Sequence, residues 1–129
     1  MVFVNHFCTI STYSHLYKVH ALADSIGDQG SDFTLHVLVT DGEVSYTFNR
    51  CRFWKLSDLK DITVAESIIS KYSKAPDKLR WSLKPVFMKF LLEKVCEKLV
   101  YIDNDQFFYS DYRFLFDLLD NHSFLLTPH

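Results

Sequence analysis

The chain has 129 residues, a length that suits one domain with a hydrophobic core. Apolar residues make up 48% and aromatic residues 16% of the chain, a composition that excludes an intrinsically disordered protein. The formal net charge is −2 without a basic cluster, which argues against nucleic acid as a partner, and no apolar run approaches the ~20 residues that span a bilayer.

The three cysteines, Cys8, Cys51 and Cys96, are widely spaced and form no Cys-x-x-Cys pair. We therefore predict free thiols in a reducing compartment, with Cys8 and Cys96 buried. The first residues are apolar but lack the basic flank of a signal peptide, so the predicted location is the cytoplasm.

The amino-terminal part of the chain predicts a strand followed by a helix. Residues 2–10 are rich in β-branched and aromatic residues, as strands are, and residues 11–14 form a polar turn. Ser14 is the expected cap of a helix whose apolar residues recur at helical spacing. Gly27 and Gly30 are expected to end that helix.

The middle of the chain repeats this alternation. Residues 33–39 predict a second strand, buried on both faces, and residues 40–42 a turn that closes it. A short third strand is expected over 53–56 and a helix over 64–72. Ala-Pro-Asp at 75–77 predicts a break after that helix.

The last third predicts a longer helix over 82–98, with Pro85 in its first turn, where a missing N–H costs nothing. A strand over 99–102, a short helix over 112–119 and a last strand over 124–127 complete the expected elements.

Strands alternate with helices along the chain, which predicts an α/β fold with a mainly parallel sheet flanked by helices. In such sheets ligands bind at the carboxyl ends of the strands. Residues 9–11, Asp41 and residues 103–105 each lie at the end of a predicted strand. We therefore expect them to converge on one edge of the sheet.

Asp103-Asn104-Asp105 is the most informative motif in the chain. Two carboxylates at the end of a hydrophobic strand can hold one Mg²⁺ or Mn²⁺ ion and leave positions open for the phosphates of a ligand. A surface turn is the alternative interpretation, because Asp is frequent in turns of any function.

Other residues are weaker candidates for a diphosphate or nucleotide site. Lys84, one turn beyond Arg80, is expected in the first turn of its helix, where a cation and the helix amino terminus would both favour phosphate. Thr9, Ser11 and Tyr13 could contact a base or ribose. The alternatives are an exposed lysine on a helix and ordinary turn chemistry.

Asp41 could also bind a base or sugar, although a residue that ends a strand is often structural. The six histidines form no metal pattern. His36, inside an apolar strand, is expected to be a hydrogen-bonded core residue, and His6 is similar; His129 could lie near the site. No Ser or Cys lies in a recognisable nucleophile motif.

The chain resembles the amino-terminal half of a GT-A-fold glycosyltransferase, of the bacterial group related to glycosyltransferase family 8. The resemblance covers nearly the whole chain and rests on the order and spacing of several short segments. These segments are 7–10 with Tyr13, 21–25, 36–42, 82–87 with 90–92, 99–105, 116–119 and 126–129.

This resemblance implies a Rossmann-like GT-A fold and a nucleotide-diphospho-sugar donor that is uridine-linked. It implies a divalent ion that bridges the diphosphate to Asp103 and Asp105. Thr9, Ile10 and Ser11 match the loop that holds the base, and Lys84 matches a position near the phosphates. Asn104 and Gln106 depart from the usual residues around the motif, and Asn104 is expected to touch the donor.

The same resemblance implies that residues 1–129 are one nucleotide-sugar-binding domain from the amino-terminal part of a longer enzyme, nearly inactive alone. The acceptor, whether glycan, lipid or protein, and the stereochemical course are not implied. A non-catalytic nucleotide-sugar-binding module and a plain interaction domain are the alternatives. Aromatic surface around Phe107, Phe108 and the last strand is expected to favour self-association.

Overall fold

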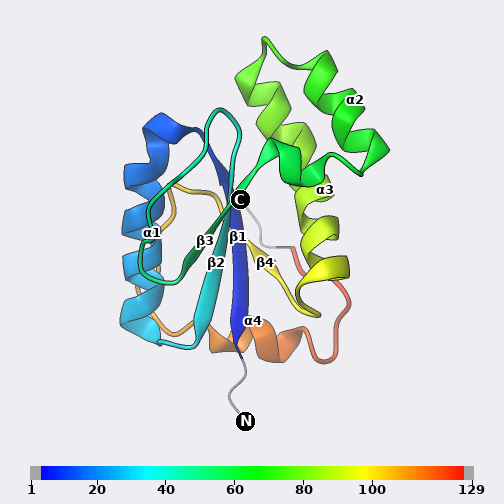
Figure 1. Ribbon diagram of the computed structural model, residues 1–129. Helices are drawn as coiled ribbons and strands as arrows, with labels where there is room; N and C mark the ends of the chain where they lie inside the picture. Colours follow the sequence, from blue (N-terminus) through cyan, green and yellow to red (C-terminus); the bar gives the residue numbers. More distant parts are fainter. Residues whose placement is uncertain (1–3, 127–129) are drawn as a thin grey trace.

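The computed structural model describes residues 4–126 and consists of a four-stranded, all-parallel sheet with helices on both faces (Figure 1). The α/β fold with a parallel sheet is therefore confirmed. The strand order is β3-β2-β1-β4. The strands are β1 (Asn5–Ser11), β2 (Phe33–Val39), β3 (Cys51–Lys55) and β4 (Val100–Tyr101).

The order of the strands reverses at β1. The chain runs outward from β1 through β2 to β3, and then returns to place β4 on the opposite side of β1. In open α/β sheets such a reversal creates a crevice at the carboxyl ends of the two strands, where ligands bind. The boundary between β1 and β4 is therefore the first place to look for a site.

One face of the sheet is covered by α1 (Leu16–Gln29) and the short α4 (Arg113–Leu118). Alternate residues of β1 and β2, among them Phe7 and Leu35, point into this layer because successive side chains of a strand face opposite sides. Phe7 meets three aromatic rings edge-on, those of Phe108, Tyr112 and Phe116, with ring centroids 5.0–5.6 Å apart. This aromatic cluster explains part of the high Phe content.

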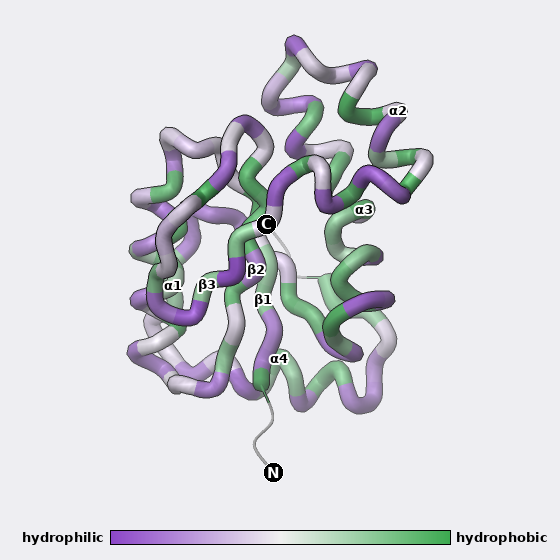
Figure 2. Tube along the Cα trace, viewed as in Figure 1, coloured by the Kyte–Doolittle hydropathy of each residue, from purple (hydrophilic) through white to green (hydrophobic). Residues whose placement is uncertain are grey.

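The other face is covered by α3 (Pro76–Lys94), with α2 (Thr63–Lys71) packed against it (Figure 1). In Figure 2, α2 alternates between hydrophobic and hydrophilic segments, as a helix with one packed face should. This layer also contains a polar group: His36 is buried and is bonded on both ring nitrogens, by Trp54 at 3.1 Å and to His6 at 3.0 Å. The prediction that His36 is a hydrogen-bonded core residue is confirmed.

The start of α1 differs from the prediction. Ser14 lies in a short 3-10 turn, η1 (Tyr13–His15), and its hydroxyl contacts Thr12 Oγ1 at 3.3 Å instead of capping the helix. His15 occupies the cap position without a side-chain cap bond. Gly27 lies inside α1, and only Gly30 follows its end.

The largest error concerns α3, which begins at Pro76 and not near residue 82. The proline at 75–77 that predicted a break is instead the first residue of the helix, where its fixed φ and missing N–H are tolerated. Pro85 therefore lies inside the helix, where it removes one backbone hydrogen bond. Lys84 consequently lies about two turns beyond the helix amino terminus.

The remaining elements match their predicted bounds to within a few residues, except for the predicted last strand. A second 3-10 turn, η2 (Leu56–Leu59), follows β3. Residues 124–126 form no strand, so the predicted last strand is wrong for the part that the structure describes, and residues 2, 3, 127 and His129 lie outside it.

Cys8 is buried as predicted, whereas Cys96 is only half-buried. Between residues 4 and 126 no helix is both long and apolar enough to cross a membrane.

Candidate functional site

The candidate site lies at the carboxyl ends of β1 and β4. Directly after β4, the backbone N–H of Gln106 donates to the carbonyl of Asp103 at 3.1 Å, so the Asp-Asn-Asp motif forms a hydrogen-bonded turn. Asp103 and Asp105 are exposed, whereas Asn104 is half-buried. The turn thus presents two carboxylates to solvent at the strand-order reversal.

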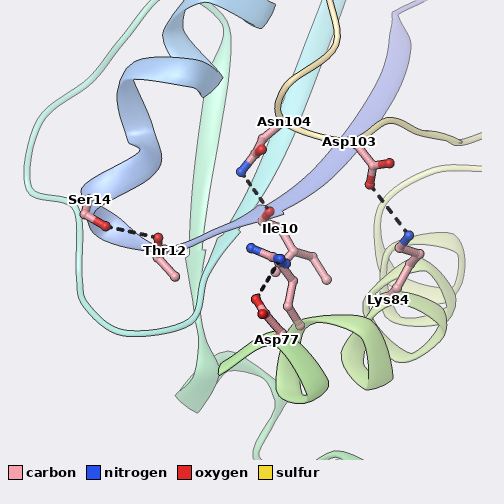
Figure 3. A network of polar contacts seen from close by, with 8 residues as sticks. Ile10, Thr12, Ser14, Asp77, Lys84, Asp103 and Asn104 are labelled. Carbon is pink, nitrogen blue, oxygen red and sulfur yellow. Dashed lines mark hydrogen bonds and ion pairs between the residues drawn. The ribbon is translucent and has the colours of Figure 1, made fainter. Parts of the chain in front are cut away.

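Asn104 ties this turn to the neighbouring strand. Its Nδ2 donates to the carbonyl oxygen of Ile10 at 3.4 Å, and Figure 3 shows the amide pointing across to that carbonyl. The backbone N–H of Ile102 also donates to the Cys8 carbonyl at 3.0 Å, which extends the pairing beyond β4. The Ile102 bond continues the strand pairing up to the motif, and the longer Asn104 bond adds a second, weaker link to β1.

The helix α3 contributes Lys84 to the same place. Its Nζ lies 3.7 Å from Asp103 Oδ1, and the two side chains point toward one another in Figure 3. The same ammonium lies 4.5 Å from the centre of the Tyr101 ring, a cation–π geometry. The prediction that the helix amino terminus assists Lys84 was wrong, because the helix begins two turns before this residue.

Tyr101 and Arg80 also contribute to the electrostatics of the site. Burial, followed by the negative charge of Asp103, raises the pKa of the Tyr101 hydroxyl above its ordinary value, while the charge of Arg80 acts in the opposite direction. The hydroxyl therefore stays protonated at neutral pH. Arg80 has a carboxylate partner of its own, Asp77, at 3.0 Å.

The loops after β1 and β2 are joined beside the turn. The backbone N–H of Tyr13 donates to Asp41 Oδ1 at 2.6 Å. A Cβ on Gly42 would lie 3.2 Å from Cδ2 of Tyr13, so the absence of a side chain at Gly42 lets the ring lie against the backbone. Half of the Tyr13 side chain stays exposed, which leaves an aromatic surface next to the loops.

The residues at the end of β1 that were predicted to contact a nucleotide do not present their side chains to solvent. Thr9, Ile10 and Ser11 are all buried, and the Ser11 hydroxyl donates to the Thr12 carbonyl at 2.8 Å. The Thr9 hydroxyl is buried among core residues and makes no hydrogen bond. Backbone groups and loop residues, more than these side chains, are therefore what this strand end offers to a ligand.

The carboxylates of the turn suit a divalent cation that is shared with a ligand. Mg²⁺ is typically held in proteins by one or two carboxylates, together with waters and substrate phosphates. Within the described chain, no three His, Cys, Asp or Glu side chains gather to hold a metal by themselves. Asp103 and Asp105 could therefore hold such an ion only together with further ligands, such as phosphate oxygens.

Two cavities lie at the opposite edge of the sheet, where the strands begin. One of about 270 Å³ is bordered by Asn5, Asp32 and Tyr112, and one of about 440 Å³ by Phe33 and Arg50. Neither cavity includes any of the predicted site residues.

Sequence reasoning missed Tyr101 and Gly42. Tyr101 was assigned only to a strand, although its position two residues before Asp103 places both side chains on the same side of an extended chain. That alternation was the available signal. The close approach of Tyr13 to Gly42 joins residues 29 positions apart, and no local pattern in the sequence indicates it.

The fold and the site together define an α/β protein with a four-stranded parallel sheet, an arrangement compatible with a Rossmann-like fold, and a polar carboxyl edge. No protein-family model matches the chain. The chain is similar to two uncharacterized proteins of Bacillus subtilis strain 168, YfnF and YfnD. It is 25% identical to YfnF over 94% of its own length and 28% identical to YfnD over 96%. The match covers 41% of either relative, so the chain spans less than half of their length.

Proposed function

We propose that the protein is a metal-dependent glycosyltransferase domain that binds a nucleotide-diphospho-sugar, with a UDP-sugar as the donor, and transfers the sugar to an acceptor. The observation that carries this proposal is the meeting of Asp103 and Lys84, 3.7 Å apart, at the carboxyl ends of β1 and β4. A carboxylate for a cation and an ammonium for phosphate then stand side by side at the strand-order reversal.

Each group has a defined task in this proposal. Asp103 and Asp105 hold the Mn²⁺ or Mg²⁺ ion through hard oxygen ligands. When bound, the ion supplies Lewis-acid stabilisation of the charge that builds on the leaving diphosphate. Lys84 neutralises a phosphate oxygen, and Asn104 keeps the turn against β1. Tyr13, held by Asp41, offers an aromatic surface for the base.

The proposal includes a reducing, cytoplasmic location. The described structure has free thiols at Cys8, Cys51 and Cys96. Burial raises the pKa of Cys51 to about 12 and that of Cys96 to about 11, which keeps both thiols protonated and slow to oxidise at neutral pH.

Calorimetric titration with uridine diphosphate tests the proposal. We expect Mn²⁺ to strengthen binding by about tenfold or more, a typical coupling between two ligands. Asp103→Asn and Asp105→Ala should remove this strengthening. Asp111→Asn is a matched control, because Asp111 is an exposed aspartate that pairs with Arg113 away from the site.

The results separate the competing functions. If Mn²⁺ does not strengthen binding and Asp105→Ala changes nothing, the motif is only a turn and the proposal fails. If binding is metal-dependent but UDP-glucose, UDP-galactose and their N-acetylated forms are neither hydrolysed nor used as donors, the chain by itself acts as a nucleotide-sugar-binding module.

A further inference from the structure

The ammonium of Lys84 lies beside Asp103, one of the two carboxylates proposed to hold the metal ion. It lies 3.7 Å from Asp103 Oδ1 on one side and 4.5 Å from the centre of the Tyr101 ring on the other. The pair is only partly shielded, with 38% of the Lys84 side chain and 59% of the Asp103 side chain exposed. Such an exposed ion pair is weak, and the long lysine side chain can leave it at little cost.

A divalent cation and Lys84 repel each other when both lie at Asp103. A cation bound to the carboxylate would stand within a few ångströms of an ammonium of the same sign, a separation too short for salt to screen, although water weakens the repulsion at this exposed position. Metal binding is therefore favoured when the ammonium moves away. A diphosphate favours this movement, because its phosphate oxygens offer Lys84 a new anionic partner.

Arg80 does not offer the same competition. Its guanidinium is paired at 3.0 Å with Asp77, which lies in the same helix as Arg80. Among the contacts of Asp103 in the described structure, Lys84 is thus the cation whose release would open the carboxylate.

We propose that Lys84 is an internal competitor that blocks Asp103 against metal ions until a diphosphate draws its ammonium away, so that metal and diphosphate bind cooperatively. This inference rests on the proposed function, because it needs a diphosphate ligand at the same turn. It adds that the contact between Lys84 and Asp103 weakens metal binding by the free protein. By linkage, the metal strengthens diphosphate binding by the same factor as the diphosphate strengthens metal binding.

The test measures Mn²⁺ binding from the electron paramagnetic resonance signal of the free ion, with and without uridine diphosphate. A protein-free titration corrects for chelation by the nucleotide. Lys84→Met should bind Mn²⁺ alone about three- to tenfold more tightly than the wild type, since an exposed repelling charge is removed. The factor by which uridine diphosphate strengthens Mn²⁺ binding should fall by about the same amount.

Three further variants make the result specific. Lys84→Arg keeps the positive charge and should bind Mn²⁺ alone as weakly as the wild type. Lys89→Met removes an exposed lysine from the same helix, one that pairs with Glu93, and should change nothing. Lys84→Gln serves as a second neutral variant, and circular dichroism verifies the fold of each.

The two proposals fail in different ways. If the neutral variants bind Mn²⁺ no more tightly than the wild type, while uridine diphosphate still strengthens Mn²⁺ binding, the competition is refuted and the proposed function survives. If no variant binds Mn²⁺ in the presence or absence of uridine diphosphate, both are refuted together.

Discussion

The two faces of the sheet pack against side chains of different kinds. The face under α1 and α4 is an aromatic and aliphatic layer centred on Phe7, whereas the face under α3 contains the hydrogen-bonded chain of Trp54, His36 and His6. The first face gains its stability from apolar contact, which does not depend on pH. The second contains groups that titrate, and it is the face from which Lys84 reaches the site. Stability and ligand binding should therefore respond to different substitutions.

The largest effect is expected in the aromatic layer. Phe7 is fully buried and meets three rings edge-on. Phe7→Ala should lower the free energy of unfolding by about 3–5 kcal/mol at any pH between 5 and 8, because it leaves a cavity in a packed core. Urea denaturation measures this. Phe124→Ala, at a residue 72% exposed, is the control and should cost less than about 0.5 kcal/mol.

The next effect concerns the pH dependence of the α3 face. Burial, and then the charges of His6 and Arg52, lower the pKa of His36 to about 4 from its ordinary 6.5. The unfolded state therefore binds more protons below pH 6.5, and the folded state loses stability as the pH falls toward 4. From pH 7.5 to 5 the loss from His36 should be about 2 kcal/mol.

Urea denaturation at several pH values tests this dependence. His36→Gln should flatten the dependence between pH 7.5 and 5, whereas His122→Gln, at an exposed histidine, should leave it unchanged. Trp54 can only donate through its indole N–H, so neutral His36 accepts at Nδ1 and carries its proton on Nε2, toward His6. A pH profile of His36→Gln identical to that of the wild type would contradict the role of the hydrogen-bonded His36 in this pH dependence.

A smaller effect should separate the two sides of the site. On the α1 side, Asp41 accepts from the Tyr13 N–H at 2.6 Å. Asp41→Ala should lower the free energy of unfolding by about 0.5–1 kcal/mol, since a charged acceptor is lost at an exposed position. It should also weaken binding of uridine, used as a probe for the base. A loss above 2 kcal/mol would show that the contact supports more than a loop.

The smallest effect is expected at Asn104, on the β4 side of the site. Asn104 Nδ2 lies 3.4 Å from the Ile10 carbonyl oxygen. Asn104→Ala should change the free energy of unfolding by less than about 0.5 kcal/mol, because so long a bond is weak. Thermal unfolding followed by circular dichroism checks this. A loss as large as that of Asp41→Ala would mean that both sides of the site are held equally firmly.

Local patterns were sufficient for most of the secondary structure. Hydrophobic periodicity located β2, α2 and α4 to within one or two residues, because the strands and helices bury faces with different spacing. Proline was ambiguous, since Pro76 begins a helix and Pro85 lies inside the same helix. The choice between breaking and starting a helix depends on what the following turns pack against, and no local pattern contains that information.

The sequence by itself determined the α/β class, the parallel sheet and the exposed carboxylates that follow β4. Alternating strand and helix patterns leave few other arrangements, and an aspartate after a buried strand must come to the surface. Only the tertiary structure decided the reversal of strand order at β1, which brings residues 10 and 104 together. It also decided that Lys84 stands over Tyr101 and against Asp103. These contacts join segments far apart in the chain, and packing across the sheet, not local propensity, sets their geometry.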